Sequence, residues 1–524
     1  MVKPTIREIA AILLILAAAM LYFPTNSISM QLSDEFWMKA ANSLSPGMFP
    51  DIDTDAEHVH RYCGTPYLLP VTNRDVDIPV FMKPLIERPF MQESYDTPEG
   101  NFKIHYDLTG IDAVRDAEVD VDPADGVPDY INFVGDVCEY VWSVQMNTLG
   151  FNGPPDDDYY PSGGDARYDI YVMDLGANLF GLTVPDEVYD YPKYTSFIEI
   201  DNDYGWYPMG YEYAIKVTLA HEFFHAVQLG YDATEYSDDP YSPWWFECTA
   251  VWMEEQVYDN INDYINYLPE YFNNPEISLL DASYHYYASC VWPIYLSERF
   301  DQEIIRKLWE LCGETAGYNV ILASQDIFTR PDLGYDNLGY NFDRAFSEFA
   351  MWNYFTGSRA ENIPDSMRYS EAHTWPKIPE QALTRISPYT DTTVSAGNEV
   401  PAPPEYLAAN YISFAVNQNI TGGLRIGFDG NNNINWRVGL VAANLESSVS
   451  HPIYKHISLD INNFGADSIR SWQKYTEVLL IPCPVGTHYF HRDATYAFGS
   501  EYSDSILGDE PIAQQNKIHN NYPN

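Results

Sequence analysis

The segment His221–His225, which reads HEFFH, limits most narrowly how this chain can fold and what it can bind. It lies within the run Tyr211 to Leu229, whose apolar residues have helical spacing, and Gly230 follows, so we predict a helix there. Histidines four residues apart on a helix lie about 40 degrees from each other around its axis, so both imidazoles can reach one ion. Glu222 projects beside them. The opposite face is apolar, as expected for a helix that packs in a core and lines a cleft.

A second helix, predicted near Pro243 to Tyr258, supplies carboxylates to the same region. Its segment WWFECTAVWMEE is apolar and rich in tryptophan, yet it holds Glu247 and Glu254. These two residues are seven apart in the sequence, so they share a helix face within about 20 degrees. An apolar helix rarely buries two carboxylates on one face unless a cation or a hydrogen-bond donor satisfies them.

Together these residues predict a catalytic zinc site with one position open to water. We assign His221, His225 and Glu247 as the metal ligands, with Glu254 and Glu255 as alternatives for the third ligand. Glu254 is then expected to accept the free N–H of a ligand histidine and so to fix its tautomer. The competing interpretation of Glu254 is an ordinary salt-bridge residue.

At these residues the chain resembles the gluzincin metallopeptidases, in which HExxH is followed by a glutamate on a later helix. The segments HEFFHAVQLGYD, WWFECTAVWMEE, YYASCVWPIYLSERF and FSEFAMWNYFTGSR are similar to those of a little-characterised group of secreted bacterial metallopeptidases. The resemblance covers about Phe102 to Arg359 and implies a zincin-like fold and a zinc site. The spacing of Glu247 and Glu254 resembles the aminopeptidase branch, but a GAMEN-type amine-binding segment does not precede the HExxH helix. We therefore expect an endopeptidase.

Such a site would hydrolyse a peptide bond with a metal-activated water, and Glu222 would act as general base and return the proton to the leaving amine. A further donor must stabilise the developing oxyanion. The resemblance, through a Tyr that precedes the YL pair on the helix predicted at Tyr286 to Phe300, points to Tyr287 for this role. Tyr286 and His285 are alternatives, and a packed aromatic is an equally good interpretation of Tyr287.

Strand patterns precede a mainly helical half in the region that holds these residues. Alternating residues predict strands, and helical spacing predicts a helix at Tyr130 to Leu149. The predicted strands are Phe102 to Tyr106, Tyr168 to Met173 and Ser196 to Ile200. By fold analogy, we expect Ser196 to Ile200 to be the edge strand to which a substrate adds. Later helices are predicted at Glu303 to Cys312 and Phe342 to Phe355. The prediction is an α+β zincin-like catalytic domain, a mixed sheet followed by a mainly helical half, at 100–396.

A Pro-rich segment, GNEVPAPPE at 397–405, predicts a linker, and beyond it the apolar period changes to two. Three runs place apolar residues on one face, namely Ile412/Phe414/Val416, Leu424/Ile426/Phe428 and Trp436/Val438/Leu440. Turn-forming residues separate these runs. We predict an all-β antiparallel sandwich at 406–504 as an accessory domain, and a flexible polar tail at 505–524.

The sequence pattern at the N-terminus predicts that the protein is secreted. Lys3 and Arg7 precede an uncharged apolar run from Ile9 to Phe23, so residues 1–29 read as a signal peptide. The run is shorter than the roughly 20 apolar residues that span a bilayer, and we expect no membrane span beyond this segment. The protein is thus expected to be secreted or held at the cell surface. Residues 30–99 are an extension or a pro-segment, and the six cysteines could form disulfides.

The net charge of the chain limits which classes of partner it can bind. With 28 basic and 76 acidic residues the net charge is -48, which disfavours nucleic acid and favours cations. Asp120, Asp122, Asp125 and Asp129 surround a Gly turn just before a helix, which suits a structural calcium ion. The alternative is a solvated acidic turn that caps the helix.

The resulting prediction is a secreted zinc-dependent endopeptidase that acts on peptides or proteins. One alternative is a zincin-fold binding or surface protein without catalytic activity, and another is a calcium-stabilised structural or adhesive protein. An intact Glu222 favours the peptidase, because a pure binder needs no general base.

Overall fold

The computed structural model describes much of the chain from residue 62 onward. The described residues are 62–65, 88–157, 164–176, 179–235, 237–238, 241–281, 283–314, 319–387, 393–395, 402–419, 421–448, 451–486 and 494–503. All of the described residues fall within one compact unit, Asp55–Asn524. The predicted signal peptide, the tail at 505–524 and most of the extension at 30–99 lie outside the described residues. In the described part, no helix combines the length and the apolar character that a bilayer crossing requires.

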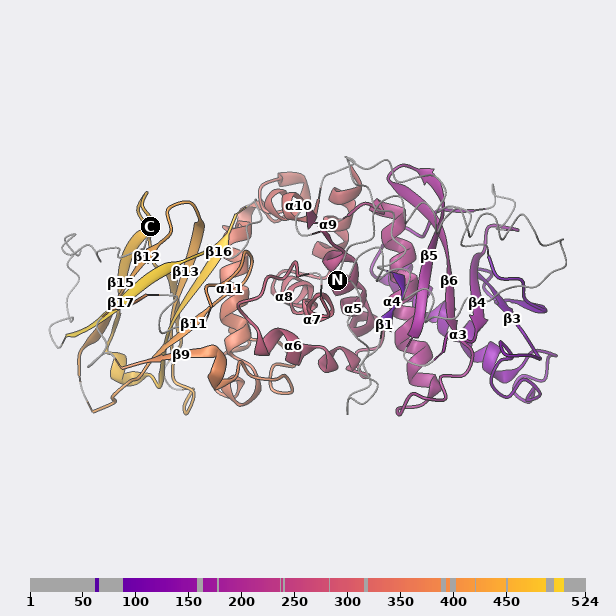
Figure 1. The fold of residues 1–524 in the computed structure, drawn as a ribbon, viewed down its shortest axis with the longest axis horizontal. Helices are drawn as coiled ribbons and strands as arrows, with labels where there is room; N and C mark the ends of the chain where they lie inside the picture. Colours follow the sequence, from indigo (N-terminus) through magenta and orange to yellow (C-terminus); the bar gives the residue numbers. More distant parts are fainter. Residues whose placement is uncertain are drawn as a thin grey trace, which may run out of the picture. The chain divides into compact units, whose positions relative to one another are not determined.

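A six-stranded mixed sheet comes first, with the strand order β1-β5-β6-β4-β3-β2. The neighbours β5, β6, β4 and β3 can be followed in Figure 1. Neighbours β3, β4 and β6 run parallel, β2 and β5 are antiparallel to their neighbours β3 and β6, and β1 pairs in parallel with β5. The strands are β1 (Tyr62–Cys63), β2 (Glu93–Asp96), β3 (Phe102–Tyr106), β4 (Tyr168–Met173), β5 (Leu179–Asp190) and β6 (Lys193–Asp201). The predicted strands at 102–106 and 168–173 are confirmed at the same residues.

The prediction that Ser196 to Ile200 forms the sheet edge is wrong. These residues belong to β6, which pairs with β4 on one side and with β5 on the other. The strand on the outer side is β5, and β1 pairs with it. An alternating pattern indicates that a segment forms a strand, but it carries no information about which strands lie beside it.

Helix α4 (Tyr211–Asp232) carries the HEFFH segment and is buried on nearly all sides, because the sheet lies against it on one side and α5 (Trp244–Val257) on another. Helix α3 (Asp129–Trp142) also contacts it. The expected end at Gly230 is wrong, since the helix continues for two more residues. A Cβ at Gly230 would lie 3.0 Å from Pro155 Cδ, so this glycine permits close packing and does not cap the helix.

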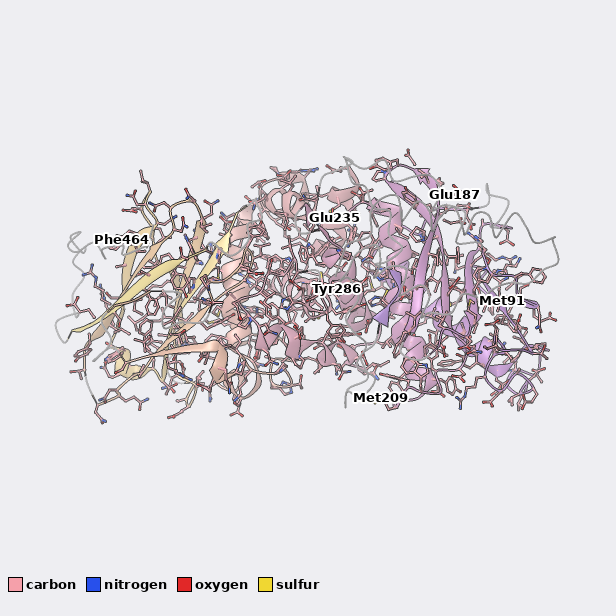
Figure 2. The ribbon with its side chains drawn as sticks, viewed as in Figure 1. Met91, Glu187, Met209, Glu235, Tyr286 and Phe464 are labelled. Carbon is pink, nitrogen blue, oxygen red and sulfur yellow. The ribbon has the colours of Figure 1, made fainter. Side chains whose placement is uncertain are left out.

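Shorter helices complete the α-rich half, and side chains fill the space between the elements (Figure 2). Many of the buried ones are aromatic. They are α6 (Leu268–Asn273), α7 (His285–Ala288), α8 (Val291–Arg299), α9 (Glu303–Glu314), α10 (Val320–Asp326) and α11 (Phe342–Tyr354). The helix predicted at Tyr286 to Phe300 is divided into α7 and α8, whereas those predicted near 303–312 and 342–355 are confirmed.

Two further sheets follow α11 and enclose a second apolar core. One sheet has the order β10-β17-β12-β15 and the other β14-β13-β16-β11-β9. Their strands are β9 (Leu383–Ile386), β10 (Thr393–Ser395), β11 (Tyr411–Phe414), β12 (Gly423–Gly430), β13 (Asn435–Ala443), β14 (Ile453–His456), β15 (Phe464–Arg470), β16 (Glu477–Val485) and β17 (Tyr496–Ser503). Pairing is antiparallel apart from β9 with β11, and β9 and β10 come from residues that the prediction placed before the linker. The molecule is thus α+β with a β-rich C-terminal region.

Candidate metal centre

Helices α4 and α5 bring the predicted ligands together in the protein interior. His221 Nε2 lies 3.4 Å from Glu247 Oε2, and His225 Nε2 lies 3.2 Å from Glu247 Oε1. Glu247 is completely buried, and neither of its carboxylate oxygens makes a hydrogen bond. His221 Nε2 is also buried without a hydrogen bond. A buried carboxylate of this kind is costly unless a cation satisfies it, so these residues fit a metal ion.

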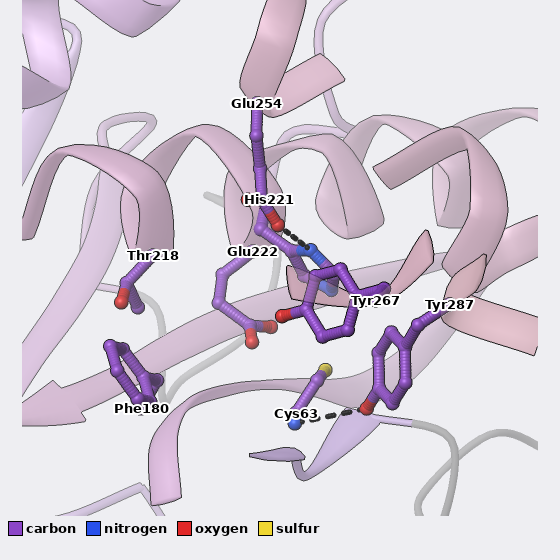
Figure 3. Close-up of a pocket in the computed structure, with 8 residues that line it drawn as sticks. All are labelled: Cys63, Phe180, Thr218, His221, Glu222, Glu254, Tyr267 and Tyr287. Carbon is purple, nitrogen blue, oxygen red and sulfur yellow. Dashed lines mark hydrogen bonds and ion pairs between the residues drawn. The ribbon is translucent and has the colours of Figure 1, made fainter. Parts of the chain in front are cut away.

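Two polar side chains orient the imidazoles. Glu254 Oε1 lies 2.8 Å from His221 Nδ1, as predicted for a residue that fixes the histidine tautomer (Figure 3). Gln228 orients His225 in the same way, since its Oε1 lies 2.7 Å from His225 Nδ1. The Gln228 amide is itself fixed, because its Nε2 donates to the Phe246 carbonyl at 2.9 Å. Carboxylate and amide oxygens only accept, so both Nδ1 atoms carry a proton, and the Nε2 atoms are the ones that face the centre.

Without a metal, the cluster holds a proton between its histidines and carboxylates. Burial opposes a charged His221, but the carboxylates of Glu247 and Glu254 outweigh it and raise the His221 pKa to about 10. Burial likewise opposes a charged Glu247, but the attraction of His225, together with His221, lowers its pKa to about 2. A metal must therefore displace a proton from this cluster, and its affinity should fall with falling pH.

A cysteine from the N-terminal segment is the fourth member of the cluster. Cys63 Sγ lies 3.4 Å from His225 Nε2. One ligand atom each from Cys63, His221, His225 and Glu247 all lie within 4.8 Å of one another, and no other such cluster occurs in the described part of the chain. Imidazole nitrogen, thiol sulfur and carboxylate oxygen are the donors that zinc accepts in a four-coordinate site. Sequence reasoning missed Cys63, because 158 positions separate it from His221.

A small pocket opens beside the cluster (Figure 3). Its lining residues come from the sheet, from α4 and α5, and from the segments around α6 and α7. They are Cys63, Phe180, Thr218, His221, Glu222, Glu254, Tyr267 and Tyr287. The pocket therefore contains the predicted general base and the predicted oxyanion donor together with a predicted metal ligand, His221. Tyr267, which no sequence pattern indicated, stacks on Tyr287 with ring centroids 5.2 Å apart.

Glu222 is buried and held by hydroxyl groups. Its Oε2 accepts from Thr65 Oγ1 at 2.9 Å and lies 2.9 Å from Thr183 Oγ1. Strand β5 approaches α4 closely at this point, since a Cβ on Gly181 would lie 3.1 Å from Glu222 Cγ. The glycine therefore allows β5 to approach Glu222, the predicted general base.

Among the three candidates for the oxyanion donor, Tyr287 is the one that lines the pocket. Its hydroxyl accepts the backbone N–H of Cys63 at 3.1 Å. His285 is fully buried elsewhere, and both of its ring nitrogens lack hydrogen-bond partners. Its role as an alternative therefore has no geometric support.

The predicted calcium loop and the cysteines complete the residues named from the sequence. Asp120 accepts from the backbone N–H groups of Asp125 and Gly126, and Asp129 accepts from those of Val121 and Asp122. These bonds stabilise the turn before α3, and calcium binding there stays a prediction. All six cysteines are free and buried, so the expectation that disulfides could form is not met in this structure.

Comparisons with known proteins add little about this site. Residues 197–321, which include α4, α5 and Tyr287, match the model of DUF6055, a family of unknown function. No curated protein matches the chain. Among solved structures, the pre-peptidase C-terminal domain of a collagenase from Bacillus anthracis is similar at 15% identity, over 23% of this chain and 94% of that one. Its TM-score of 0.16 is too low to bear on fold or function.

Proposed function

We propose that the protein is a secreted zinc peptidase with a zincin-like fold, of the gluzincin type, that cleaves within peptide chains. The observation that carries the proposal is the buried carboxylate of Glu247, which has no hydrogen-bond partner and faces the Nε2 atoms of His221 and His225. These three residues would hold the ion. When bound, zinc would supply a Lewis acid that acidifies water and polarises the scissile carbonyl.

The surrounding residues have positions that suit peptide hydrolysis. Glu222 lines the pocket beside His221, where its carboxylate can take a proton from the attacking water and deliver it to the leaving amine. Thr183 steadies that carboxylate from β5. Tyr287 can donate its hydroxyl proton to the oxyanion that develops on the substrate.

Strand β5 offers the surface for an extended substrate. It is the strand that runs past the pocket, and it is antiparallel to β6 on its inner side. Its outer side pairs with a short backbone segment, β1, which shows that an extended chain fits there. A peptide bound in this way would gain main-chain hydrogen bonds whatever its side chains, which favours an endopeptidase.

The test compares Glu222→Gln with the parent chain and with Glu212→Gln, an exposed residue on the same helix. We expect each protein to bind one zinc ion per chain by elemental analysis. Glu222→Gln should lower peptide-library cleavage by about 10²–10⁴-fold, because the general base is lost. Glu212→Gln should have no effect. Because Cys63 and Thr65 lie against Tyr287 and Glu222, cleavage is measured in the parent and in a Cys63→Ala background.

Zinc binding without cleavage in either background would contradict the peptidase and would support a binding protein that uses the same fold. Absence of zinc binding in the parent chain would contradict the metal site itself.

A further inference from the structure

We propose that the segment Tyr62–Thr65 is a built-in inhibitor and that Cys63 is the fourth ligand of the zinc ion. This inference rests on the proposed function and goes beyond it, because it assigns the chain a latent state. The whole segment is a few residues long, and each of its described side chains or backbone groups contacts a different part of the site.

Cys63 closes the position that a catalytic site leaves to water. Its sulfur lies 3.4 Å from His225 Nε2, and it belongs to the same cluster of ligand atoms as His221 and Glu247. A lone thiol is weak evidence for a metal ligand, but the unpartnered, fully buried carboxylate of Glu247 independently indicates an ion at this point. On binding, the thiol would lose its proton to solvent and ligate as the thiolate. Four protein ligands make a closed site of the structural kind, with no place for water.

The same segment occupies the two other groups that the mechanism needs. Thr65 Oγ1 donates to Glu222 Oε2 at 2.9 Å, so the general base already holds a hydrogen bond. The backbone N–H of Cys63 donates to the Tyr287 hydroxyl at 3.1 Å (Figure 3). Residues 63 and 65 therefore contact the metal position, the proposed base and the proposed oxyanion donor.

Backbone pairing holds the segment along the substrate strand. Gly64 N–H donates to the Gly181 carbonyl at 3.0 Å, and the Thr183 N–H donates to Thr65 Oγ1 at 2.8 Å. A Cβ on Gly64 would lie only 2.8 Å from Leu182 Cβ, so the close approach requires glycine. A substrate that adds to β5 must first displace this segment.

The first experiment detects the sulfur ligand without measuring catalysis. Co²⁺ replaces zinc in the full-length parent, in Cys63→Ala and in Cys138→Ala, whose cysteine is also buried but lies on α3 outside the cluster. A thiolate ligand produces an intense sulfur-to-cobalt charge-transfer band in the near ultraviolet. We expect the band in the parent and in Cys138→Ala and its loss in Cys63→Ala. A parent without the band, or a band that survives in Cys63→Ala, would overturn the ligand assignment.

The second experiment measures whether the position is closed. Acetohydroxamate, a small chelating metal ligand, is titrated into the cobalt proteins and its binding is followed by visible absorption. We expect at least a tenfold lower Kd for Cys63→Ala than for the parent and for Cys138→Ala. Equal Kd values would overturn the latent state.

Peptide cleavage separates this inference from the proposed function. If Cys63→Ala cleaves the peptide library at least ten times faster than the parent, both the peptidase function and the inhibitory role of Tyr62–Thr65 are supported. Should the spectra behave as expected while no variant cleaves any peptide, the cysteine ligand stands and the peptidase fails. If the parent and Cys63→Ala cleave equally fast and neither shows the sulfur band, the peptidase function is supported and the inhibitory role of the segment is contradicted.

Discussion

At the residue scale, the orientation of the two histidines is what the proposed zinc ion would require. His221 and His225 each hold their Nδ1 proton against a fixed acceptor, Glu254 in one case and Gln228 in the other. The Nε2 atoms therefore face the centre before any ion arrives, so little reorganisation is needed on binding. Such acceptors usually contribute to metal affinity although they never touch the metal.

Glu254→Gln is expected to weaken zinc binding by about 10–100-fold, because the amide is a poorer acceptor for His221 Nδ1–H. The measurement is competition with a chelator of known affinity. Glu255→Gln is the matched control: burial, followed by the charge of Glu371, raises the Glu255 pKa to about 9, so this side chain is already neutral near pH 7. Equal loss of affinity in both variants would contradict the specific role of Glu254.

His285 makes the fold sensitive to acid. Burial lowers its pKa from 6.5 to about 4, although Asp281 acts in the opposite direction. Since the unfolded chain takes up this proton first, stability is lost as the pH falls from about 6.5 towards 4. At pH 5 the loss is about 2 kcal/mol. His285→Phe should abolish this loss of stability at pH 5, whereas His373→Phe, which changes an exposed histidine, should leave it unchanged. Urea unfolding at pH 5 and pH 7.5 measures the difference.

At the element scale, the buried side chain of Arg88, which precedes β2, contacts two strands of the first sheet. Arg88 forms ion pairs with Asp157 and Asp169 and a third with Asp186 at 3.0 Å, and its side chain is almost entirely buried. Asp169 lies on β4 and Asp186 on β5, so one side chain connects two strands that are not neighbours in the sheet. The three carboxylates raise the Arg88 pKa despite its burial, which keeps the guanidinium charged.

Arg88→Met is expected to lower the free energy of unfolding by about 3–5 kcal/mol, because it leaves buried carboxylates without a counter-charge. Arg167→Met is the control, since Arg167 pairs with Asp96 and Asp165 in a more exposed position and should cost at most about 1 kcal/mol. Urea unfolding measures both. Similar values for the two variants would show that the Arg88 cluster does not stabilise the sheet.

At the scale of the whole molecule, the helical half and the β-rich region share one core. The apolar cluster around the site includes Tyr411, Val441 and Leu479 from the five-stranded sheet. Tyr411 also donates its hydroxyl to the Ala350 carbonyl of α11 at 2.8 Å, and Tyr454 donates to Ser347 at 3.1 Å. The β-rich region therefore covers the outer face of α11.

This shared core predicts a single cooperative unfolding transition in calorimetry. A chain that ends before Leu383 should lose near-ultraviolet circular dichroism and aggregate, because the apolar face of α11 becomes exposed. Tyr411→Phe, which removes one hydrogen bond, should cost only about 0.5–1.5 kcal/mol. Two separate calorimetric transitions would instead show that the β-rich region folds independently.

Much of the site could be predicted because it depends on short spacings. The four-residue separation of His221 and His225 and the seven-residue separation of Glu247 and Glu254 have the same meaning on any helix, and α4 and α5 place all four as expected. Gln228 could have been found in the same way, since it lies one turn beyond His225. Tyr287 was named through resemblance; the structure places it in the pocket, and its role as oxyanion donor stays a prediction.

Spacing within each of the two helices thus sufficed to name the candidate ligands and the candidate base, since helix geometry is nearly independent of the rest of the chain. The lateral order of the strands and the contacts of Cys63 and Thr65 were decided by the tertiary structure alone. Those contacts depend on β1 pairing with β5 across more than a hundred residues, and no local pattern encodes such a pairing. Local geometry therefore placed the residues of the candidate centre, whereas long-range packing determined which groups cover it.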